Sequence, residues 1–131
     1  MDGNGRWAQK NNLNRISGHR QGMKSVKSII QESRKLGIKY LTLYAFSAQN
    51  WNRPKHEVNA LMELLKFYLL EEGGTLLEKD IRLDAIGRLK SLPEDAHKVL
   101  NDTMELTKSC TGMTLTLALS YGSREEIIDA V

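Results

Sequence analysis

The segment Tyr44-Ala-Phe-Ser-Ala-Gln-Asn-Trp-Asn-Arg-Pro54 decides how the rest of the chain is interpreted. It begins as the end of the run 39–46, whose aliphatic and aromatic residues favour a strand. It ends at Pro54, whose fixed φ suits the first turn of a helix. Ligands of open α/β sheets bind beyond the carboxyl ends of strands, so this polar loop is a candidate binding site. The same residues also suit a plain strand-to-helix connection whose tryptophan covers the core.

The bulk composition describes a single ordinary globular domain, residues 1–131, with a net charge of only +3. A nucleic-acid binder is expected to carry a much denser basic surface. The one cysteine, Cys110, excludes an internal disulfide and indicates a reducing compartment. No apolar run approaches the roughly 20 residues of a membrane span, and no signal peptide is visible. We therefore expect a cytoplasmic protein, at most peripheral to a membrane.

Helical and strand patterns alternate along the chain. Helices are predicted at about 19–36, 57–71 and 93–106 and from 124 onward, and strands at 39–46, 81–86 and 113–119. The pair Gly73-Gly74 is expected to interrupt the second helix or to mark its fraying. This alternation predicts an α/β fold: a parallel sheet flanked by helices, with three strands and about four helices. Because no strand precedes the first helix and the last helix is short, we expect a truncated domain.

The opening 22 residues concentrate glycine and base around one carboxylate, Asp2. Gly3 and Gly5 permit positive φ, and successive backbone N–H groups in such a loop form an anion-binding nest. Gly18 to Gly22 is expected to lead into a helix whose N-terminus favours anions. Side chains suited to phosphate oxygens surround this loop: Arg6, Arg15, His19 and Arg20. Asp2 together with substrate phosphates can hold Mg²⁺. Considered alone, each of these residues is typical of a turn or a solvated surface. Their clustering within 22 residues predicts a diphosphate site.

Other site types lack their signatures. The run Gly18-His-Arg-Gln-Gly-Met-Lys-Ser25 does not have Walker spacing, and Gly3-Asn-Gly5 lacks the third glycine of a dinucleotide fingerprint. One cysteine and three scattered histidines do not make a zinc site. Ser47 has no evident base partner, so the sequence gives no support for a hydrolase triad.

Several segments together resemble the cis-prenyltransferase family. They are Met-Asp-Gly-Asn-Gly-Arg-Trp-Ala at 1–8; Arg15 with Gly18-His19 and Gly22; 41–47 with Asn50-Trp-Asn-Arg-Pro54; Glu57 with Leu61-Met62; and, more weakly, Tyr121-Gly122 with Arg124 and Ile127. Ser120 and Ser123 stand where the family commonly has asparagine and glycine. The family's later motifs, which carry most of the isopentenyl diphosphate site, are not in this chain. We therefore expect it to hold the allylic half of an active site, and its turnover alone is left open.

The resemblance implies a Mg²⁺-dependent condensation of isopentenyl diphosphate with an allylic diphosphate such as farnesyl diphosphate. The product would be a long-chain cis-polyprenyl (undecaprenyl) diphosphate, a lipid-carrier precursor for cell-wall synthesis that is delivered to the membrane. A homodimer is implied for the full-length protein, and no nucleic acid is involved.

The resemblance also implies residue roles. Asp2 would bind Mg²⁺ and assist diphosphate departure, and Asn50 is the second candidate catalytic residue. The allylic diphosphate would be held by the backbone of Gly3, Asn4 and Gly5 and the side chains of Arg6, Arg15 and His19, with Trp7 also in the substrate site. The reacting centre would be shaped by Asn4, Phe46, Ser47, Asn50, Trp51 and Arg53, with Glu57 supporting their loop.

The second predicted helix has an apolar stripe broader than one contact needs, because Leu64 and Tyr68 widen it. We hypothesise that Met62, Leu65 or Leu69 lines a tunnel for a growing isoprenoid chain; ordinary core packing is the alternative. Other classes of protein also fit part of the sequence. They are a non-catalytic prenyltransferase-like binding subunit, a generic phosphate-binding α/β domain and, last, a nucleic-acid binder.

Overall fold

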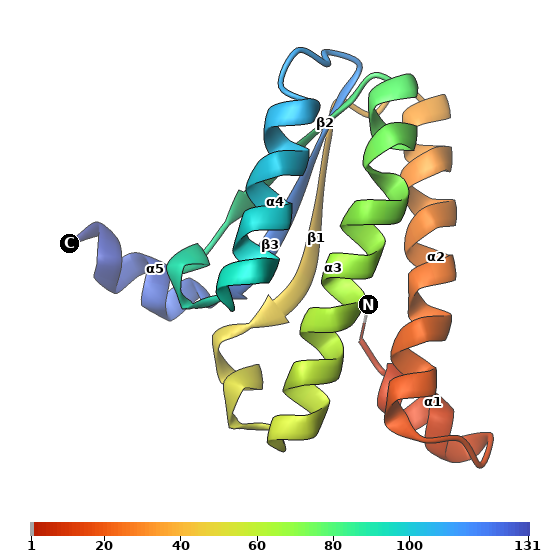
Figure 1. Ribbon diagram of the computed structural model, residues 1–131, viewed down its shortest axis with the longest axis vertical. Helices are drawn as coiled ribbons and strands as arrows, with labels where there is room; N and C mark the ends of the chain where they lie inside the picture. Colours follow the sequence, from red (N-terminus) through yellow and green to blue (C-terminus); the bar gives the residue numbers. More distant parts are fainter. Residues whose placement is uncertain (1) are drawn as a thin grey trace.

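Three parallel strands form the sheet, in the order β1–β3–β2 (Figure 1). The strands are β1 (Tyr40–Ser47), β2 (Ile81–Ile86) and β3 (Met113–Tyr121) in a computed structural model that describes residues 2–131. Thr42 of β1 and Asp84 of β2 both pair with Thr116 of β3. The carboxyl ends of all three strands therefore lie at the same end of the sheet, which confirms the predicted parallel α/β architecture.

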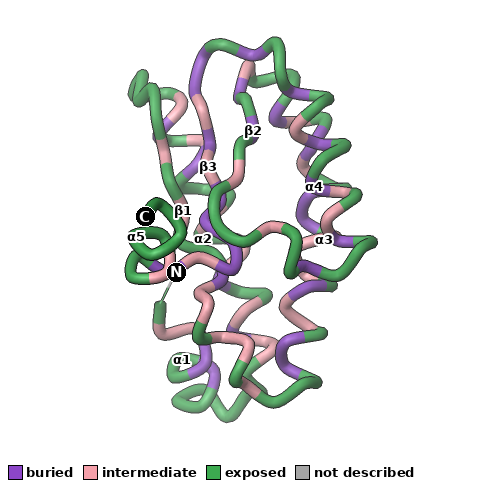
Figure 2. The backbone as a smooth tube through the Cα atoms, turned by 90° about the vertical axis from the view of Figure 1, so that its left-hand side faces the viewer, coloured by how far each residue is buried: buried purple, intermediate pink, exposed green. Residues whose placement is uncertain are grey.

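Within residues 2–131, five α-helices accompany the sheet: α1 (Asn4–Lys10), α2 (Arg15–Lys35), α3 (Lys55–Glu78), α4 (Glu94–Leu106) and α5 (Ser123–Ala130). Short 3₁₀ turns, η1 (Ala48–Asn52) and η2 (Leu89–Ser91), follow β1 and β2. Figures 1 and 2 show α3 and α4 side by side against one face of the sheet, with α2 alongside α3 and α1 across the lower end of α2. The central strand β3 is the most buried of the three because both its edges are paired.

The core lies between the sheet and the helices. Its largest fully buried side chains include Leu69 of α3, Leu100 of α4 and Leu115 of β3. Each such side chain contributes roughly 1.5–3 kcal/mol by leaving water. The residues that alternate with the buried ones on the edge strands stay exposed, such as Tyr40 and Tyr44 on β1 and Arg82 on β2. Helices therefore cover one face of the sheet, and the edge strands are exposed on the other.

The strand predictions are confirmed to within two residues, and β2 has the predicted bounds. The prediction of about four helices is confirmed with five in residues 2–131, and α1 is the one not predicted, because the glycine-rich opening is not an open loop. Of Gly3 and Gly5, only Gly3 has a positive φ, 83°; it caps α1, and Gly5 is buried inside this helix. A seven-residue helix containing glycine has weak intrinsic propensity, so the sequence alone does not predict it.

Glycine at position 18 permits α1 to cross α2 at close range. A Cβ on Gly18 would lie 2.1 Å from the carbonyl oxygen of Asn4 and 2.9 Å from the Cβ of Ala8. Gly18 and Gly22 lie inside α2 and not before it, because the helix begins at Arg15, where the side chain of Asn14 accepts a hydrogen bond from the Ser17 N–H at 2.8 Å. The expectation that Gly18 to Gly22 precedes a helix N-terminus is therefore wrong.

The expected interruption at Gly73-Gly74 is also absent, and α3 continues to Glu78. Gly73 is buried against α4, where an added Cβ would lie 3.4 Å from Thr103 Cγ2. The glycine thus allows two helices to approach closely, and tertiary packing outweighs its low helix propensity.

Candidate functional site: a cavity with a polar mouth

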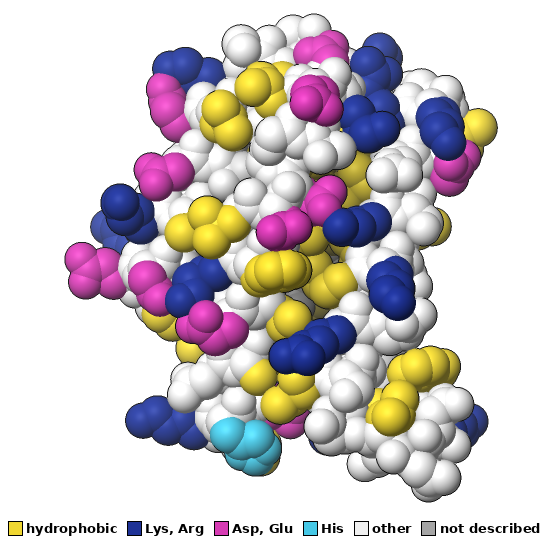
Figure 3. Space-filling model, turned by 45° about the vertical axis from the view of Figure 1, so that its right-hand side comes forward, with side chains coloured by type: hydrophobic (Ala, Val, Ile, Leu, Met, Phe, Trp, Pro, Cys, Tyr) yellow, Lys and Arg dark blue, Asp and Glu magenta, His cyan; other side chains and the backbone are white. Residues whose placement is uncertain are grey.

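A cavity of about 860 Å³ opens between α2, α3 and β1. Polar residues surround one end of it: Asp2, Gly3, Asn4, Gly5, Arg6, Arg15, His19, Ser47, Asn50 and Arg53. Apolar side chains form most of the remainder: Met23, Val26, Leu43, Phe46, Leu61, Met62, Leu64, Leu65, Leu117 and Leu119, with Tyr68. Figure 3 shows hydrophobic side chains gathered along a hollow on this face, with Lys and Arg on one side. We name the two parts the polar mouth and the apolar interior.

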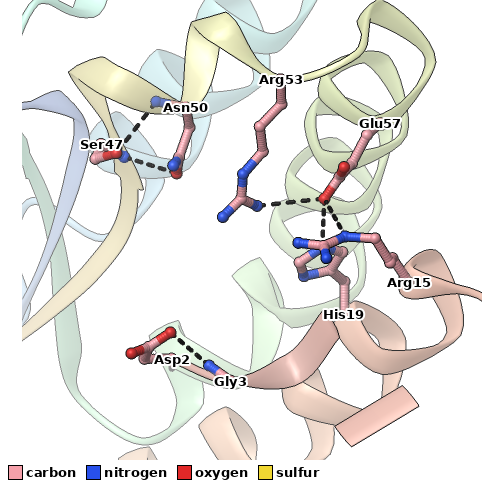
Figure 4. Close-up of polar contacts among 8 residues, drawn as sticks. All are labelled: Asp2, Gly3, Arg15, His19, Ser47, Asn50, Arg53 and Glu57. Carbon is pink, nitrogen blue, oxygen red and sulfur yellow. Dashed lines mark hydrogen bonds and ion pairs between the residues drawn. The ribbon is translucent and has the colours of Figure 1, made fainter. Parts of the chain in front are cut away.

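The carboxylate of Glu57 ties the polar mouth together. Its Oε1 accepts hydrogen bonds from Arg15 Nε, His19 Nε2 and Arg53 Nη1, each at 3.3 Å. Arg15 and His19 come from α2, whereas Arg53 comes from the connection between η1 and α3 (Figure 4). The carboxylate is 6% exposed, while the guanidinium-bearing side chains are 44% and 34% exposed. The acid is therefore buried behind donors that remain accessible from the cavity.

These contacts fix the charge of Glu57. Burial by itself would raise the pKa of this carboxyl, but hydrogen bonds from His19 and Arg15 and the charges of Arg15 and Arg53 outweigh it. The pKa of Glu57 therefore lies below its ordinary value, and the group is anionic at neutral pH. An anionic Glu57 orients three donors that could each also bind an incoming anion.

Asp2 and Arg6 lie on the other side of the polar mouth. Asp2 Oδ1 accepts the Gly3 N–H at 2.6 Å, and Oδ2 pairs with Arg6 Nη2 at 3.3 Å. The Asp2 side chain is 97% exposed, so its oxygens are open to further ligands. Figure 4 shows that Asp2 and Gly3 make no drawn contact with the cluster of Arg15, His19, Arg53 and Glu57.

The loop after β1 is held rigidly by its own side chains. Ser47 Oγ accepts the Asn50 N–H at 3.2 Å, and Asn50 Oδ1 accepts the Ser47 N–H at 3.1 Å, forming a capping box for η1. Trp51 stacks edge-on against Phe46, with ring centroids 4.9 Å apart, and its Nε1 donates to Ser120 Oγ at 2.9 Å. Through this hydrogen bond Trp51 links the loop to β3, and its side chain does not line the cavity.

The structure brings most of the predicted site residues together. The residues that line the cavity are Asp2, Gly3, Asn4, Gly5, Arg6, Arg15, His19, Phe46, Ser47, Asn50 and Arg53. Trp7, Trp51 and Glu57 do not line it: Trp7 is 43% exposed, and the other two contact residues that do. Arg20 is exposed and also lies outside it.

Of the three residues hypothesised to line a tunnel, two line the cavity and one does not. Met62 and Leu65 are on its wall, whereas Leu69 is buried in the core at 1% exposure. The hypothesis is therefore wrong for Leu69. Leu65 and Leu69 lie one helical turn apart, and helical periodicity alone does not tell which of the two faces the cavity and which faces the core. A Leu69→Trp substitution would consequently test core packing and not tunnel length.

Sequence reasoning missed three contributors to the site. Met23 and Val26 of α2 line the apolar interior, and Ser120, which has a positive φ of 50°, receives the Trp51 hydrogen bond. The i, i+3 spacing of Met23 and Val26 identifies an apolar helix face, but it does not tell which element that face meets. The local sequence does not predict that Ser120 accepts a hydrogen bond from Trp51, because that contact depends on how closely η1 approaches β3.

Within residues 2–131, no group of three or more His, Cys, Asp or Glu side chains is placed to hold a metal ion. Asp2 is the only carboxylate among the cavity-lining residues that the structure describes. A hard cation such as Mg²⁺ is often held by one or two carboxylates together with substrate phosphates. The exposed Asp2 oxygens fit that arrangement, in which the ligand would complete the coordination. None of the helices described is long and apolar enough to span a bilayer.

The chain is similar to known prenyltransferases over its whole length. The family model described as "Putative undecaprenyl diphosphate synthase" matches residues 1–131. An isoprenyl transferase of Geobacter sulfurreducens is 52% identical over 130 residues, 99% of this chain and 53% of that protein. A ditrans,polycis-undecaprenyl-diphosphate synthase ((2E,6E)-farnesyl-diphosphate specific) of Micrococcus luteus is 50% identical over 131 residues, 100% of this chain and 53% of that protein.

A solved structure gives the same result at the level of the fold. The lavandulyl diphosphate synthase of Lavandula x intermedia, crystallised in complex with dimethylallyl diphosphate, superposes with a TM-score of 0.96 at 36% identity. The match covers 99% of this chain and 56% of that one. The chain thus spans about half the length of the curated relatives it matches. The chain belongs to the undecaprenyl diphosphate synthase family of prenyltransferases.

Proposed function

We propose that this chain forms the allylic half of a cis-prenyltransferase active site. In the reaction, isopentenyl diphosphate condenses with farnesyl diphosphate and the chain is extended to a long cis-polyprenyl diphosphate of the undecaprenyl type. One observation carries the proposal: a single cavity of about 860 Å³ has cationic donors at one end and hydrocarbon side chains along the rest. An allylic diphosphate has the same division, with an anionic head and an apolar tail.

The polar mouth suits the diphosphate head. Arg15 and Arg53 present planar guanidinium groups that match phosphate oxygens, and His19 adds a ring nitrogen. Glu57 orients all three without lining the cavity itself. Preorganised donors of this kind stabilise charge without having to reorient when the charge develops.

The apolar interior suits the prenyl tail. Met23 and Val26 of α2, Leu61 and Leu65 of α3 and Phe46 of β1 all line it. Burying hydrocarbon there is favourable by about 25 cal/mol per Å². The named ligands of two relatives, farnesyl diphosphate and dimethylallyl diphosphate, are both allylic diphosphates, which supports the substrate class.

In the proposed step, the carbon–oxygen bond between the allylic C1 and its diphosphate breaks, and the diphosphate leaves with the electron pair. The double bond of isopentenyl diphosphate forms the new carbon–carbon bond to C1, and loss of a proton leaves a new double bond. This chain's arginines and His19 would hold the departing diphosphate. Asn50, fixed by the capping box with Ser47, would position the reacting end of the allylic group.

Asp2 would hold Mg²⁺ together with diphosphate oxygens. The cation would supply charge stabilisation to the leaving diphosphate. Arg6 pairs with Asp2 and would move toward the diphosphate when the carboxylate binds the metal. We further propose that the protein works in the cytoplasm as a homodimer and that its product enters the membrane as a lipid carrier for cell-wall synthesis.

Calorimetric titration of farnesyl diphosphate with Mg²⁺ tests the proposal. The wild-type chain should bind, the Arg6→Ala/Arg15→Ala variant should lose binding, and Arg20→Ala should bind like wild type because Arg20 lies outside the cavity. Farnesol, which lacks the diphosphate, should bind far more weakly. No binding of farnesyl diphosphate by a folded wild-type chain would overturn the proposal.

Turnover is measured separately with labelled isopentenyl diphosphate. Incorporation of label into an organic-extractable product, lost in Asn50→Ala, would show that the chain itself catalyses condensation. Binding without incorporation would assign the chain a prenyl-diphosphate-binding role and place catalysis in a longer protein or a partner.

A further inference from the structure

Two glycines hold polar side chains in place where α1 crosses α2. Gly5 of α1 lies against the guanidinium of Arg15, which belongs to α2. Gly22 of α2 lies against the amide of Asn4, which belongs to α1. Both glycines are buried, and all four residues line the cavity at or near its polar mouth. Each helix thus supplies a bare backbone position on which a polar side chain of the other helix rests.

The contact at Gly5 is with the flat face of the guanidinium. A Cβ added to Gly5 would lie 2.8 Å from Arg15 Cζ, 2.9 Å from Nη2 and 3.1 Å from Nε. The central carbon is the nearest atom and two nitrogens are almost as close, as expected for a point above a planar group and not at its edge. At Gly22, an added Cβ would lie 2.5 Å from Asn4 Nδ2 and 2.9 Å from Cγ. A side chain at either position would occupy the space that the polar group now takes.

Gly5 and Glu57 together determine the orientation of Arg15. Arg15 Nε donates to Glu57 Oε1 at 3.3 Å, which fixes one edge of the guanidinium (Figure 4). That bond alone leaves the group able to rotate about it, and the contact with Gly5 limits this rotation. The N–H groups on Nη1 and Nη2 are not used by the bond, and the side chain is 44% exposed. Arg15 is therefore an oriented donor before any ligand enters.

We propose that Gly5 and Gly22 are positioning residues of the diphosphate site, which set the orientation in which Arg15 and Asn4 meet the ligand. This inference rests on the proposed function, because it assumes that the polar mouth binds a diphosphate. A glycine that serves helix packing alone loses stability when alanine replaces it. A positioning glycine loses affinity instead, and the two roles are therefore separable by experiment.

The principal test is Gly5→Ala. The three atoms nearest the added methyl group all belong to the movable end of Arg15, and alanine favours a helix more than glycine does, so Tm should be no lower than in wild type. In calorimetric titration with Mg²⁺, farnesyl diphosphate should bind about tenfold more weakly, because the displaced guanidinium no longer presents its donors. The backbone N–H of residue 5 is retained. Gly74→Ala is the matched control: no atom lies within 4 Å of its added Cβ, so its affinity should equal that of wild type.

A double-mutant cycle shows whether the effect passes through Arg15. Arg15→Lys keeps the charge but lacks the planar group, so adding Gly5→Ala to it should change the affinity by less than about twofold. A further tenfold loss in that background would mean that the methyl group acts on the ligand directly, and would overturn the inference. Gly22→Ala should likewise weaken binding in wild type and add little to Asn4→Ala. A folded Gly22→Ala variant with wild-type affinity would overturn the inference for Gly22.

A measurement without ligand gives a second readout. Burial raises the pKa of Glu57, but hydrogen bonds from His19 and Arg15 are among the contacts that bring it below its ordinary value. Displacing the guanidinium should therefore raise the pKa of Glu57 in Gly5→Ala, as measured by carbon-13 NMR. The same pKa should be unchanged in Gly74→Ala.

The outcomes separate the two proposals. If folded wild type does not bind farnesyl diphosphate, the proposed function fails and this inference fails with it. If wild type binds but Gly5→Ala binds equally well, or keeps the wild-type pKa of Glu57, the inference fails and the proposed function stands. A Gly5→Ala variant that unfolds, or whose Tm falls clearly below that of wild type, would assign Gly5 to folding and would also overturn the inference.

Discussion

Different interactions hold the two ends of the cavity together. At the polar mouth, one buried carboxylate, Glu57, collects donors from two parts of the chain that lie about 40 residues apart in sequence. At the apolar end, Met62, Leu65 and Tyr68 follow one another along a single helix and are held by packing. The mouth therefore depends on directional contacts between distant segments, whereas the interior depends on the volume and shape of side chains on α3.

This difference predicts different sensitivities. Directional contacts respond to charge, pH and sub-ångström displacement, while packing responds to side-chain volume and is nearly independent of pH. Substitutions at the two ends should therefore separate in their size and in their pH dependence.

The largest effect is expected at the helix crossing that supports the mouth. Gly18→Ala would place a Cβ 2.1 Å from the carbonyl oxygen of Asn4, and backbone cannot yield as a flexible side chain can. Overpacking of this kind should lower the free energy of unfolding by about 3 kcal/mol. Gly74→Ala is the control: no atom lies within 4 Å of the added Cβ, so the helix should be stabilised by about 0.5–1 kcal/mol. Urea unfolding curves measure both, and a Gly18→Ala variant as stable as wild type would contradict the crossing described.

The next effect distinguishes the mouth from the interior by pH. Glu57→Gln should cost about 2 kcal/mol at pH 7, because three donors lose a charged acceptor. The folded-state pKa of Glu57 is lowered, so its contribution is fully present above the unfolded-state value of about 4.3 and is lost as pH falls through the lower folded-state value. The difference between wild type and Glu57→Gln should therefore be constant above about pH 5 and shrink below about pH 4.

Met62→Ala provides the comparison from the apolar interior. Met62 is 4% exposed and carries no charge, so its loss should lower stability equally at every pH. Denaturation series from pH 7 to pH 3 measure both variants. A Glu57→Gln deficit that stays unchanged at pH 3 would show that the carboxylate is not held in its charged form by the cluster.

A smaller effect is expected where the loop joins β3. Trp51→Phe keeps the ring contact with Phe46 but removes the donor to Ser120, and Ser120 retains its contact with Ser91. Loss of one such hydrogen bond should cost about 1 kcal/mol. Trp7→Phe, at a half-exposed position outside the cavity, should change stability by less than about 0.5 kcal/mol. Equal effects of the two substitutions would count against a specific role for the Trp51 hydrogen bond.

The smallest effect on stability, with a clear effect on binding, is expected for Asp2→Asn. The side chain is 97% exposed, so the free energy of unfolding should change by less than about 0.5 kcal/mol. Farnesyl diphosphate binding in Mg²⁺ should weaken roughly tenfold, or about 1.4 kcal/mol. The same titration in EDTA should show no difference from wild type. Asp102→Asn, at an exposed position on α4, is the charge-matched control; an equal loss of affinity there would assign the effect to net charge.

Prediction from sequence succeeded best where the periodic pattern was strong. The alternation of Ile81, Leu83 and Ala85 before Gly87 gave β2 its observed bounds, because a half-buried strand has a period of two. Prediction failed for α1, because the glycines there were interpreted as positions of positive φ in a loop. In the structure Gly5 and Gly18 serve close packing, which depends on a partner helix that the local sequence does not show.

The candidate site divides in the same way. Arg53 and Glu57 lie four residues apart, so the start of α3 suffices to bring them together. Arg15 and His19 reach the same carboxylate only because α2 packs alongside α3. The sequence around these two residues does not indicate that Glu57 is their partner. Likewise, the wide apolar stripe of α3 indicated more than one contact surface, but it did not tell that Leu65 faces a cavity and Leu69 the core.

The sequence by itself determined the parallel α/β fold and the residues from which a diphosphate site could be built. These follow from local periodicity and from the chemistry of side chains, which are properties of the chain and not of its folding. Only the tertiary structure decided that Glu57 joins donors of α2 to Arg53 before α3, and that Leu65 faces the cavity while Leu69 faces the core. Both depend on the distances between segments remote in sequence, and those distances are set by packing the helices onto the sheet.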